Sequence, residues 1–183
     1  MTKSKSNKQA VLVGVNHIAQ WNKDSPESKI LKVKLTEIVR NHNIDLIAEE
    51  FSEEALAGNK VKKTVCQDVA GVLGINHKLC DLNSQARKKH GIPLRNEVKS
   101  QLNIKGLVLA NNQKDKLIEA ELRKYNTIRE KGWFNKIENE VAQNLVFVCG
   151  SSHLKGFRSI LINNGYEVVM RNIENEAVLK KKK

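Results

Sequence analysis

One stretch of the sequence decides the fold: Leu145-Val146-Phe147-Val148-Cys149, followed at once by Gly150-Ser151-Ser152-His153. An apolar run of this length, rich in β-branched and aromatic residues, is typical of a buried strand. A helix is predicted over residues 154–163 and ends at Gly165, and a further strand is predicted over residues 166–170. A strand, a helix and a strand in this order are typical of a parallel βαβ unit.

The same alternation runs through the rest of the chain. Ser25-Pro26-Glu27 has the N-cap, the first-position proline and the acid of a helix start. The other expected strands are residues 11–15, 44–48 and 77–80, and the other expected helices lie within residues 26–41, 53–72, 84–89 and 113–139. The sequence therefore predicts an α/β fold of three layers, with a mainly parallel central sheet of about five strands flanked by helices.

Length and composition favour one compact domain. The chain has 183 residues and a mass of 20.7 kDa, which suffices for a hydrophobic core. Hydrophobic residues make up 40% and charged residues 28%, which argues against global disorder and a collagen-like protein. No apolar run approaches the roughly 18 residues of a membrane-spanning helix. Residues 1–7 also lack the apolar segment of a secretory signal.

The net charge of +12 comes from 32 basic and 20 acidic side chains and suggests an acidic partner such as nucleic acid. Seven lysines lie in two stretches without acids, namely Lys3, Lys5, Lys8 and residues 180–183. The remaining 25 basic and 20 acidic side chains leave a net charge of +5. Such runs are either solvated tails or arms that bind nucleic acid or membrane. We expect a disordered basic leader over residues 1–9, one domain over residues 10–172 and a basic tail over residues 173–183.

Cysteine usage indicates a reducing, cytoplasmic compartment. The sequence has three cysteines, Cys66, Cys80 and Cys149, which form no CxxC motif and leave an odd one out. Cys80 and Cys149 stand at the ends of apolar runs, where a reduced, buried thiol is expected.

Polar residues gather where the predicted strands end. Asn16-His17 follows the first strand, Glu49-Glu50 the second, Asp81 the third and residues 150–153 the fourth. Because parallel strands with right-handed crossovers end at one edge of the sheet, we expect these side chains to meet there. Open α/β sheets bind ligands in a crevice at this edge.

Two histidines stand in matching GxxH settings, His17 after Gly14 and His153 after Gly150. Glycine permits a tight turn and a close approach of the backbone to a ligand. Imidazole transfers protons near neutral pH or binds transition metals, and two histidines with a carboxylate suit an open site for zinc, manganese or iron. The structural alternative is that each histidine caps a helix or fills a polar hole.

The acid of this site is Glu49 or Glu50, because adjacent residues of a strand face opposite ways. One of them is expected to act as a metal ligand or general base. The alternative is a solvated acidic strand end that leads into a helix at Ser52.

Arg129 interrupts an apolar helical stripe. The stripe consists of Ile118, Leu122, Tyr125, Arg129 and Trp133, at steps of three and four residues. A partly buried guanidinium requires a carboxylate, phosphate or carbonyl partner, so Arg129 is expected to hold a site carboxylate or stabilise an oxyanion. The alternative is that it extends from the margin of the stripe into solvent.

Other enzyme templates are excluded. Leu154 replaces the second glycine of a GxSxG motif, and the chain contains no GxxxxGK[ST] or GxGxxG motif for a nucleotide. The turn at Gly150-Ser151-Ser152 can still bind an anion through the free amides of a helix N-terminus.

In order and spacing, five blocks resemble the TraB/Tiki superfamily, which is related in fold to erythromycin esterase and ChaN-like proteins. The blocks are Val13-Gly14-Val15-Asn16-His17, residues 45–51, residues 129–133, residues 148–156 and residues 161–168. The resemblance spans residues 11–170. The chain departs from the family in being short, in lacking visible membrane anchors and in matching poorly over residues 83–112.

The resemblance implies a metal-dependent hydrolytic site, since Tiki members are described as manganese- or cobalt-dependent proteases. The implied catalytic residues are His17, Glu50, Arg129 and His153, and the implied metal ligands are His17, Glu50 and His153. Glu50 is preferred because the family places its acid directly before an apolar residue, here Phe51. Asp81 resembles the acid of an aspartate–arginine block, with Arg87 as its counterpart. Secondary site candidates are Glu49, Asp81, Gly14, Gly150, Ser151 and Ser152.

The leading functional prediction is therefore a metal-dependent hydrolase of an amide, peptide or ester bond. A divalent ion (manganese, cobalt or zinc) at His17, Glu50 and His153 is expected to activate water. The alternatives are a basic nucleic-acid- or polyanion-binding module and a catalytically silent interaction protein. The few aromatic residues, 4% of the chain, argue against stacking platforms for single strands.

Overall fold

The chain forms an α/β fold around a five-stranded parallel sheet, as predicted. The computed structural model describes residues 8–104, 111–140 and 142–173. The strands are β1 (Lys8–Val15), β2 (Leu46–Glu49), β3 (Asn76–Leu79), β4 (Asn144–Gly150) and β5 (Tyr166–Asn172), and their order in the sheet is β3-β2-β4-β1-β5. Every neighbouring pair is parallel.

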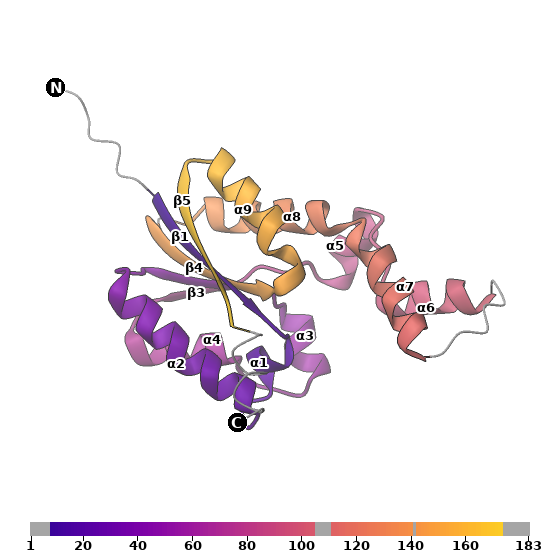
Figure 1. The fold of residues 1–183 in the computed structure, drawn as a ribbon, viewed down its shortest axis with the longest axis horizontal. Coiled ribbons are helices and arrows are strands. Elements are labelled where there is room, and N and C mark those ends of the chain that lie inside the picture. The colour runs from indigo at the N-terminus through magenta and orange to yellow at the C-terminus, as the bar shows by residue number, and fades with distance from the viewer. Residues whose placement is uncertain (1–7, 105–110, 141, 174–183) are drawn as a thin grey trace.

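Helices cover both faces of the sheet (Figure 1). The connections from β1 to β2 and from β2 to β3 contain α1 (Ile18–Trp21), α2 (Pro26–Asn41), α3 (Glu53–Gly58) and α4 (Val65–Leu73). The later connections run in the opposite direction along the sheet and contain α5 (Ser84–Lys89), α6 (Arg95–Ile104), α7 (Asn111–Arg123), α8 (Asn126–Glu138), the short 3-10 helix η1 (Ser151–His153) and α9 (Leu154–Asn163). Right-handed crossovers therefore place α2 and α4 on one face and α8 and α9 on the other.

Each face of the sheet has its own core, because alternate residues of a strand point to opposite sides. Val11, Val13 and Val15 of β1 pack with the buried side chains of α2 and α4. Leu12 packs on the other face with Trp133 and the rings of β4 and α9. There Trp133 stacks on Phe147 with centroids 5.4 Å apart, and Phe147 lies 4.4 Å from Phe157.

Several predicted boundaries are confirmed. Helix α2 begins at Pro26 with Ser25 as its N-cap, whose Oγ accepts a hydrogen bond from the Ser28 N–H at 3.0 Å. Helix α9 covers residues 154–163 as expected, and Gly165 follows it with φ of 84°. This left-handed conformation favours glycine and lets the chain turn into β5.

Two predicted helices are each divided in two, which corrects the sequence analysis. The helix expected over residues 113–139 breaks between α7 and α8, where the N–H of Tyr125 bonds the carbonyl of Leu122 and leaves the α-helical pattern. Asn126 and Thr127, which restart the helix, are weak helix formers. The helix expected within residues 53–72 ends at Gly58, and α4 restarts with a capping box between Thr64 and Gln67.

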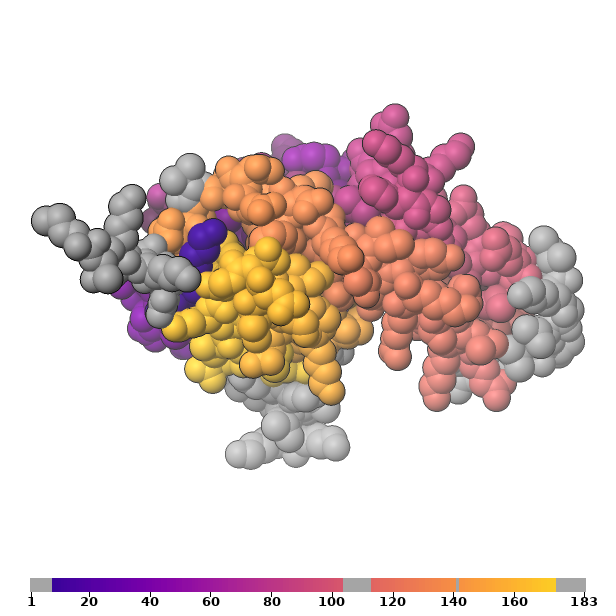
Figure 2. Space-filling model, turned by 90° about the horizontal axis from the view of Figure 1, so that it is seen from above, coloured from indigo at the N-terminus to yellow at the C-terminus, as the bar shows by residue number. Residues whose placement is uncertain are grey.

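Helices α6 and α7 form an arm that extends from the body of the molecule (Figure 2). Arg95 of α6 bonds Asp115 of α7 at 2.9 Å and also pairs with Glu119. The sequence pattern delimits no helix between residues 89 and 113, so it did not predict α6. It also missed the single turn of α1.

The two basic ends lie outside the described residues, apart from Lys8. Strand β1 begins at Lys8, so Lys8 and Gln9 belong to the sheet rather than to the leader expected over residues 1–9. The Lys8 ammonium lies 5.3 Å from the centre of the Tyr166 ring. At the other end, Ile173 is buried and donates its N–H to the carbonyl of Gly14 at 3.0 Å. In the ranges given above, no helix is long and apolar enough to cross a membrane.

Candidate functional site

The two GxxH turns lie side by side at the point where the sheet reverses its direction of winding. Strands β1 and β4 are parallel neighbours, and Val15 pairs with Gly150 at their carboxyl ends. The chain leaves β1 toward the face of α2 and leaves β4 toward the face of α9. Open α/β sheets bind ligands at such a switch point, so the fold places His17 and His153 where a ligand-binding crevice is expected, between the ends of β1 and β4.

The carboxylate of Glu50 is buried and lies between the two histidines. Its Oε1 atom lies 3.7 Å from Nε2 of His17 and 3.5 Å from Nε2 of His153. Its Oε2 atom accepts a hydrogen bond from the Gly150 N–H at 2.8 Å. A Cβ at Gly150 would lie 3.0 Å from His17 Nε2, so glycine is what lets the backbone approach this closely.

His17 is the histidine that solvent and a ligand can reach, because its side chain is 51% exposed. Its Nδ1 atom lies 2.9 Å from Oε1 of Gln20, on the single turn of α1. This contact leaves Nε2 directed toward Glu50. Gln20 was not foreseen, because nothing in the sequence indicates that a turn of helix follows the GxxH motif.

His153 is buried and is held from its other side. Its Nδ1 atom lies 2.8 Å from Oε1 of Glu130, and its ring packs edge-on against Trp133 at 4.8 Å. Because an ionised carboxylate only accepts, Nδ1 of His153 carries the hydrogen and Nε2 carries the lone pair. The sequence analysis missed Glu130, although it shares a helix face with Phe134 and Ile137, both buried as Glu130 is.

Arg129 has the carboxylate partners that its place in an apolar stripe required. Its guanidinium contacts Glu50 Oε1 and donates from Nη2 to Asp81 Oδ1 at 3.0 Å. Its Nη1 lies 3.4 Å from Nε2 of His153. Burial lowers the pKa of Arg129, but Glu50 and Asp81 raise it above its ordinary value, so the guanidinium stays charged.

Asp81 connects this arginine to a second one. Its Oδ2 accepts from Arg87 at 2.7 Å, and its Oδ1 also accepts from the Trp133 indole at 3.1 Å. Burial alone raises the pKa of Asp81, but Arg129 and Arg87 outweigh it and lower the pKa to about 2. The structure thus pairs Asp81 with both Arg129 and Arg87.

Glu49 points to the opposite side of the sheet from Glu50 and has no exposed surface. It is the centre of a separate network, in which its oxygens accept from Gln20 Nε2 at 2.9 Å and from the Thr64 hydroxyl at 2.5 Å. Nε2 of His77 lies 2.9 Å from its Oε1. Glu49 is therefore linked to His17 through the side chain of Gln20.

The remaining secondary candidates lie at or just after the carboxyl ends of β1 and β4. A Cβ at Gly14 would lie 2.6 Å from the Leu154 side chain, so this glycine allows α9 to pack on β1. Ser151 donates its hydroxyl to Oδ1 of Asn172, at the end of β5, at 3.2 Å, while Ser152 is exposed.

The donor types at Glu50 suit a metal ion, but their arrangement does not. In the part of the chain that the structure describes, no three His, Cys, Asp or Glu side chains form a group that can hold a metal. The guanidinium of Arg129 lies on the Glu50 oxygen that both histidines face. A divalent cation at this oxygen would repel the guanidinium. The ion expected at His17, Glu50 and His153 stays a prediction.

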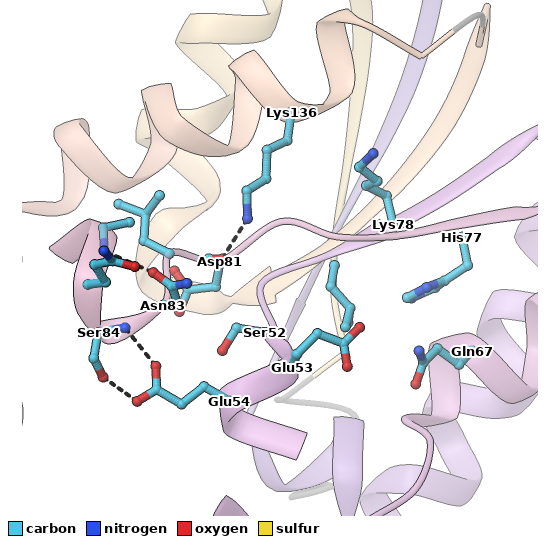
Figure 3. Close-up of a pocket in the computed structure, with 14 residues that line it drawn as sticks. Ser52, Glu53, Glu54, Gln67, His77, Lys78, Asp81, Asn83, Ser84 and Lys136 are labelled. Atoms are coloured by element: carbon cyan, nitrogen blue, oxygen red, sulfur yellow. Dashed lines mark hydrogen bonds between the residues drawn. The ribbon is translucent and has the colours of Figure 1, made fainter. Parts of the chain in front are cut away.

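A pocket of about 890 Å³ is lined by Asp81 but not by Glu50, His17 or His153 (Figure 3). It is bordered by α3, β3, α5 and α8, and Asp81 is the only cluster residue that lines it. Glu54 and Ser84 are hydrogen-bonded on one wall, and Lys136 reaches the Asp81 carbonyl on another at 2.8 Å. His77 also lines the pocket and contacts Glu49 from that side.

Comparison with known proteins found no match among family models, curated proteins or solved structures. The resemblance to the TraB/Tiki superfamily thus rests on the sequence blocks quoted above.

Proposed function

We propose that the protein hydrolyses an amide or ester bond at the crevice between β1 and β4. One observation carries this proposal: Nε2 of His17 and Nε2 of His153 face the same buried carboxylate oxygen of Glu50, while each Nδ1 is held by a further polar side chain. In hydrolases, the nucleophile is activated by a histidine base whose second ring nitrogen is held by an orienting group. The resemblance to the TraB/Tiki superfamily supports hydrolysis as the class of reaction.

His17 acts as the general base, because it is the exposed histidine of the pair. Its Nε2 takes a proton from a water molecule as the water oxygen attacks the carbonyl carbon of the substrate. The carboxylate of Glu50, 3.7 Å away, stabilises the imidazolium that forms. The same proton then passes to the leaving nitrogen or oxygen.

Arg129 and His153 hold Glu50 in place for this step. Arg129 bonds the buried carboxylate and offsets its charge, and His153 fixes the guanidinium from the other side. The developing oxyanion is stabilised by the free N–H groups at the start of η1, directly after Gly150, whose Cβ position lies 3.0 Å from His17 Nε2. Ser151 and Ser152 supply these groups.

The test compares wild-type protein with His17→Gln on a panel of chromogenic esters and peptide amides. Loss of a general base lowers kcat by about 10²–10⁴-fold. His90→Gln is the matched control, because His90 is an exposed histidine at the end of α5. Equal rates of hydrolysis in wild-type and His17→Gln protein would overturn the proposal.

Metal dependence is measured in the same experiment. Protein purified without chelator is analysed for manganese, cobalt and zinc, and the assay is repeated after dialysis against EDTA. Hydrolysis that survives the chelator indicates that the site works with Arg129 on Glu50, as the structure has it. If activity is lost with EDTA and His17→Gln also loses bound metal, the ion expected from the sequence is present and Arg129 must leave Glu50 to admit it.

A further inference from the structure

Nothing in the sequence analysis assigned a role to Gln20, yet this side chain is completely buried between two ionisable groups. Its Nε2 lies 2.9 Å from Glu49 Oε2, and its Oε1 lies 2.9 Å from His17 Nδ1. It therefore joins a buried carboxylate on one side of β2 to the exposed histidine of the crevice. A side-chain amide donates from its nitrogen and accepts at its oxygen. If one neighbour is an acceptor, the other must therefore be a donor.

The direction is set by Glu49. The Thr64 hydroxyl already accepts the Gln67 N–H at 3.0 Å, so its own hydrogen is directed to Glu49. His77 supplies a further ring nitrogen at 2.9 Å. Because Thr64 donates to Oε1 of Glu49 and His77 faces the same oxygen, the carboxylate serves as the acceptor, and the amide presents its NH₂ group to Oε2.

The orientation of the Gln20 amide determines which ring nitrogen of His17 carries the hydrogen. With the NH₂ group turned to Glu49, the amide oxygen faces His17 Nδ1 and can only accept. Nδ1 must then carry a hydrogen, and in the neutral ring the lone pair is left on Nε2, the nitrogen that faces Glu50 and Gly150.

We propose that Gln20 and Glu49 are positioning residues that fix the tautomer of His17, with the hydrogen on Nδ1 and the lone pair on Nε2. Only the kinetic part of this inference rests on the proposed function. Neither residue touches the substrate. His77 and Thr64 secure Glu49 in turn, so the chain of contacts runs from the pocket of Figure 3 to the crevice.

The experiment reads the tautomer directly. Nitrogen-15 spectra of histidine-labelled protein, taken above the pH at which imidazole is protonated, distinguish the nitrogen that carries hydrogen from the one that carries the lone pair. In wild-type protein, His17 is expected to show hydrogen on Nδ1, whereas exposed His90 serves as the unconstrained reference. Gln20→Met removes both hydrogen bonds at similar volume and is expected to leave His17 as a mixture of tautomers.

Gln67→Met is the matched control. Gln67 bonds the Thr64 N–H at 2.9 Å but does not contact His17, so its loss weakens the start of α4 and leaves the His17 tautomer unchanged. A His17 lone pair on Nδ1 in wild-type protein overturns the inference. An unchanged tautomer in a folded Gln20→Met protein overturns it as well.

The kinetic readout separates the inference from the proposed function. Because Gln20 does not touch the substrate, Gln20→Met is expected to lower kcat about 10²-fold, at the low end of a general base's contribution, and to leave KM unchanged. If the tautomer shifts as expected while wild-type protein hydrolyses nothing, the positioning role stands and the proposed function fails. If kcat falls without a change of tautomer, the positioning role fails.

Discussion

The guanidinium of Arg129 bonds the carboxylate of Glu50 across 79 positions of sequence. This pair joins α8 to the end of β2, and the exposed fraction of the side chain is 14% for Arg129 and 2% for Glu50. Asp81 joins the same arginine from the end of β3. The ion pair is thus the contact through which three elements hold the centre of the candidate site.

Replacing Arg129 by methionine is expected to cost about 3–5 kcal/mol of folding free energy, because two buried carboxylates lose their common partner. Urea unfolding followed by circular dichroism measures this loss. Arg95→Met is the matched control: Arg95 bonds Asp115 and Glu119 on the arm, where half of its side chain is exposed, and such pairs contribute about 0–1 kcal/mol. Equal losses in the two variants would show that the Glu50 pair is no stronger than a surface pair.

The carboxyl group of Asp81 is expected to make the folding stability depend on pH. Its pKa falls from 3.8 in the unfolded chain to about 2 in the folded protein. A depressed pKa contributes stability above the unfolded value, and this contribution, on the order of 2 kcal/mol, is lost as the pH falls from about 4 to about 2. Thermal unfolding between pH 6 and pH 2 measures it.

Asp81→Asn removes this dependence, because asparagine does not titrate. The variant is less stable at pH 6 and loses less stability on acidification than wild-type protein. Asp115→Asn, on the exposed arm, leaves the acid profile nearly unchanged. A wild-type profile in Asp81→Asn protein would show that other carboxylates dominate the acid transition.

Alanine substitutions at Gly156 and at Gly71 are expected to change the stability of the protein in opposite directions. A Cβ at Gly156 would lie 2.3 Å from Glu130 Oε2, so alanine displaces the carboxylate that holds His153. We expect a loss of about 1–3 kcal/mol from the disturbed packing and hydrogen bond. Gly71 lies in α4 with nothing within 4 Å of its Cβ position, and Gly71→Ala is expected to stabilise by about 0.5–1 kcal/mol. Thermal unfolding of both variants checks the opposite signs.

The sequence predicted which residues meet in the crevice, because a parallel sheet brings every strand exit to one edge. His17, Glu50, Asp81 and the Gly150 turn follow four different strands, so topology alone placed them together. Arg129 was found because a charge within an apolar helical stripe needs a buried partner. The same reasoning applied to the next residue would have found Glu130, which shares a face with Phe134 and Ile137.

Side-chain direction could not be predicted in the same way. Gln20 stands on a single helical turn that no periodicity indicates, and its role depends on Glu49 on the far side of β2. The break between α7 and α8 also escaped prediction, because the apolar stripe of Ile118, Tyr125 and Trp133 continues across it. Hydrophobic periodicity indicates which face of a helix is buried. It gives little information on where one helix ends and the next begins.

The reactivity of the three cysteine thiols is expected to show whether the core is closed to solvent. Cys66, Cys80 and Cys149 are free and buried. Burial raises the pKa of all three thiols, in Cys80 to about 12, and the neighbouring Glu49 and Glu50 raise the pKa of Cys66 and Cys149 further. Because the thiolate is the reactive form, native protein at pH 8 should react slowly with Ellman's reagent, whereas the unfolded chain should release three equivalents at once.

Val72→Cys provides the internal standard for this measurement, since Val72 is 79% exposed on α4. The variant should show one fast thiol and three slow ones in its native state. The slow phase should accelerate with urea as the core opens, and Arg129→Met should shift that acceleration to lower urea concentrations. A fast reaction of Cys149 in native wild-type protein would contradict its place beneath Glu50 and Glu130, and with it the buried setting on which the candidate site depends.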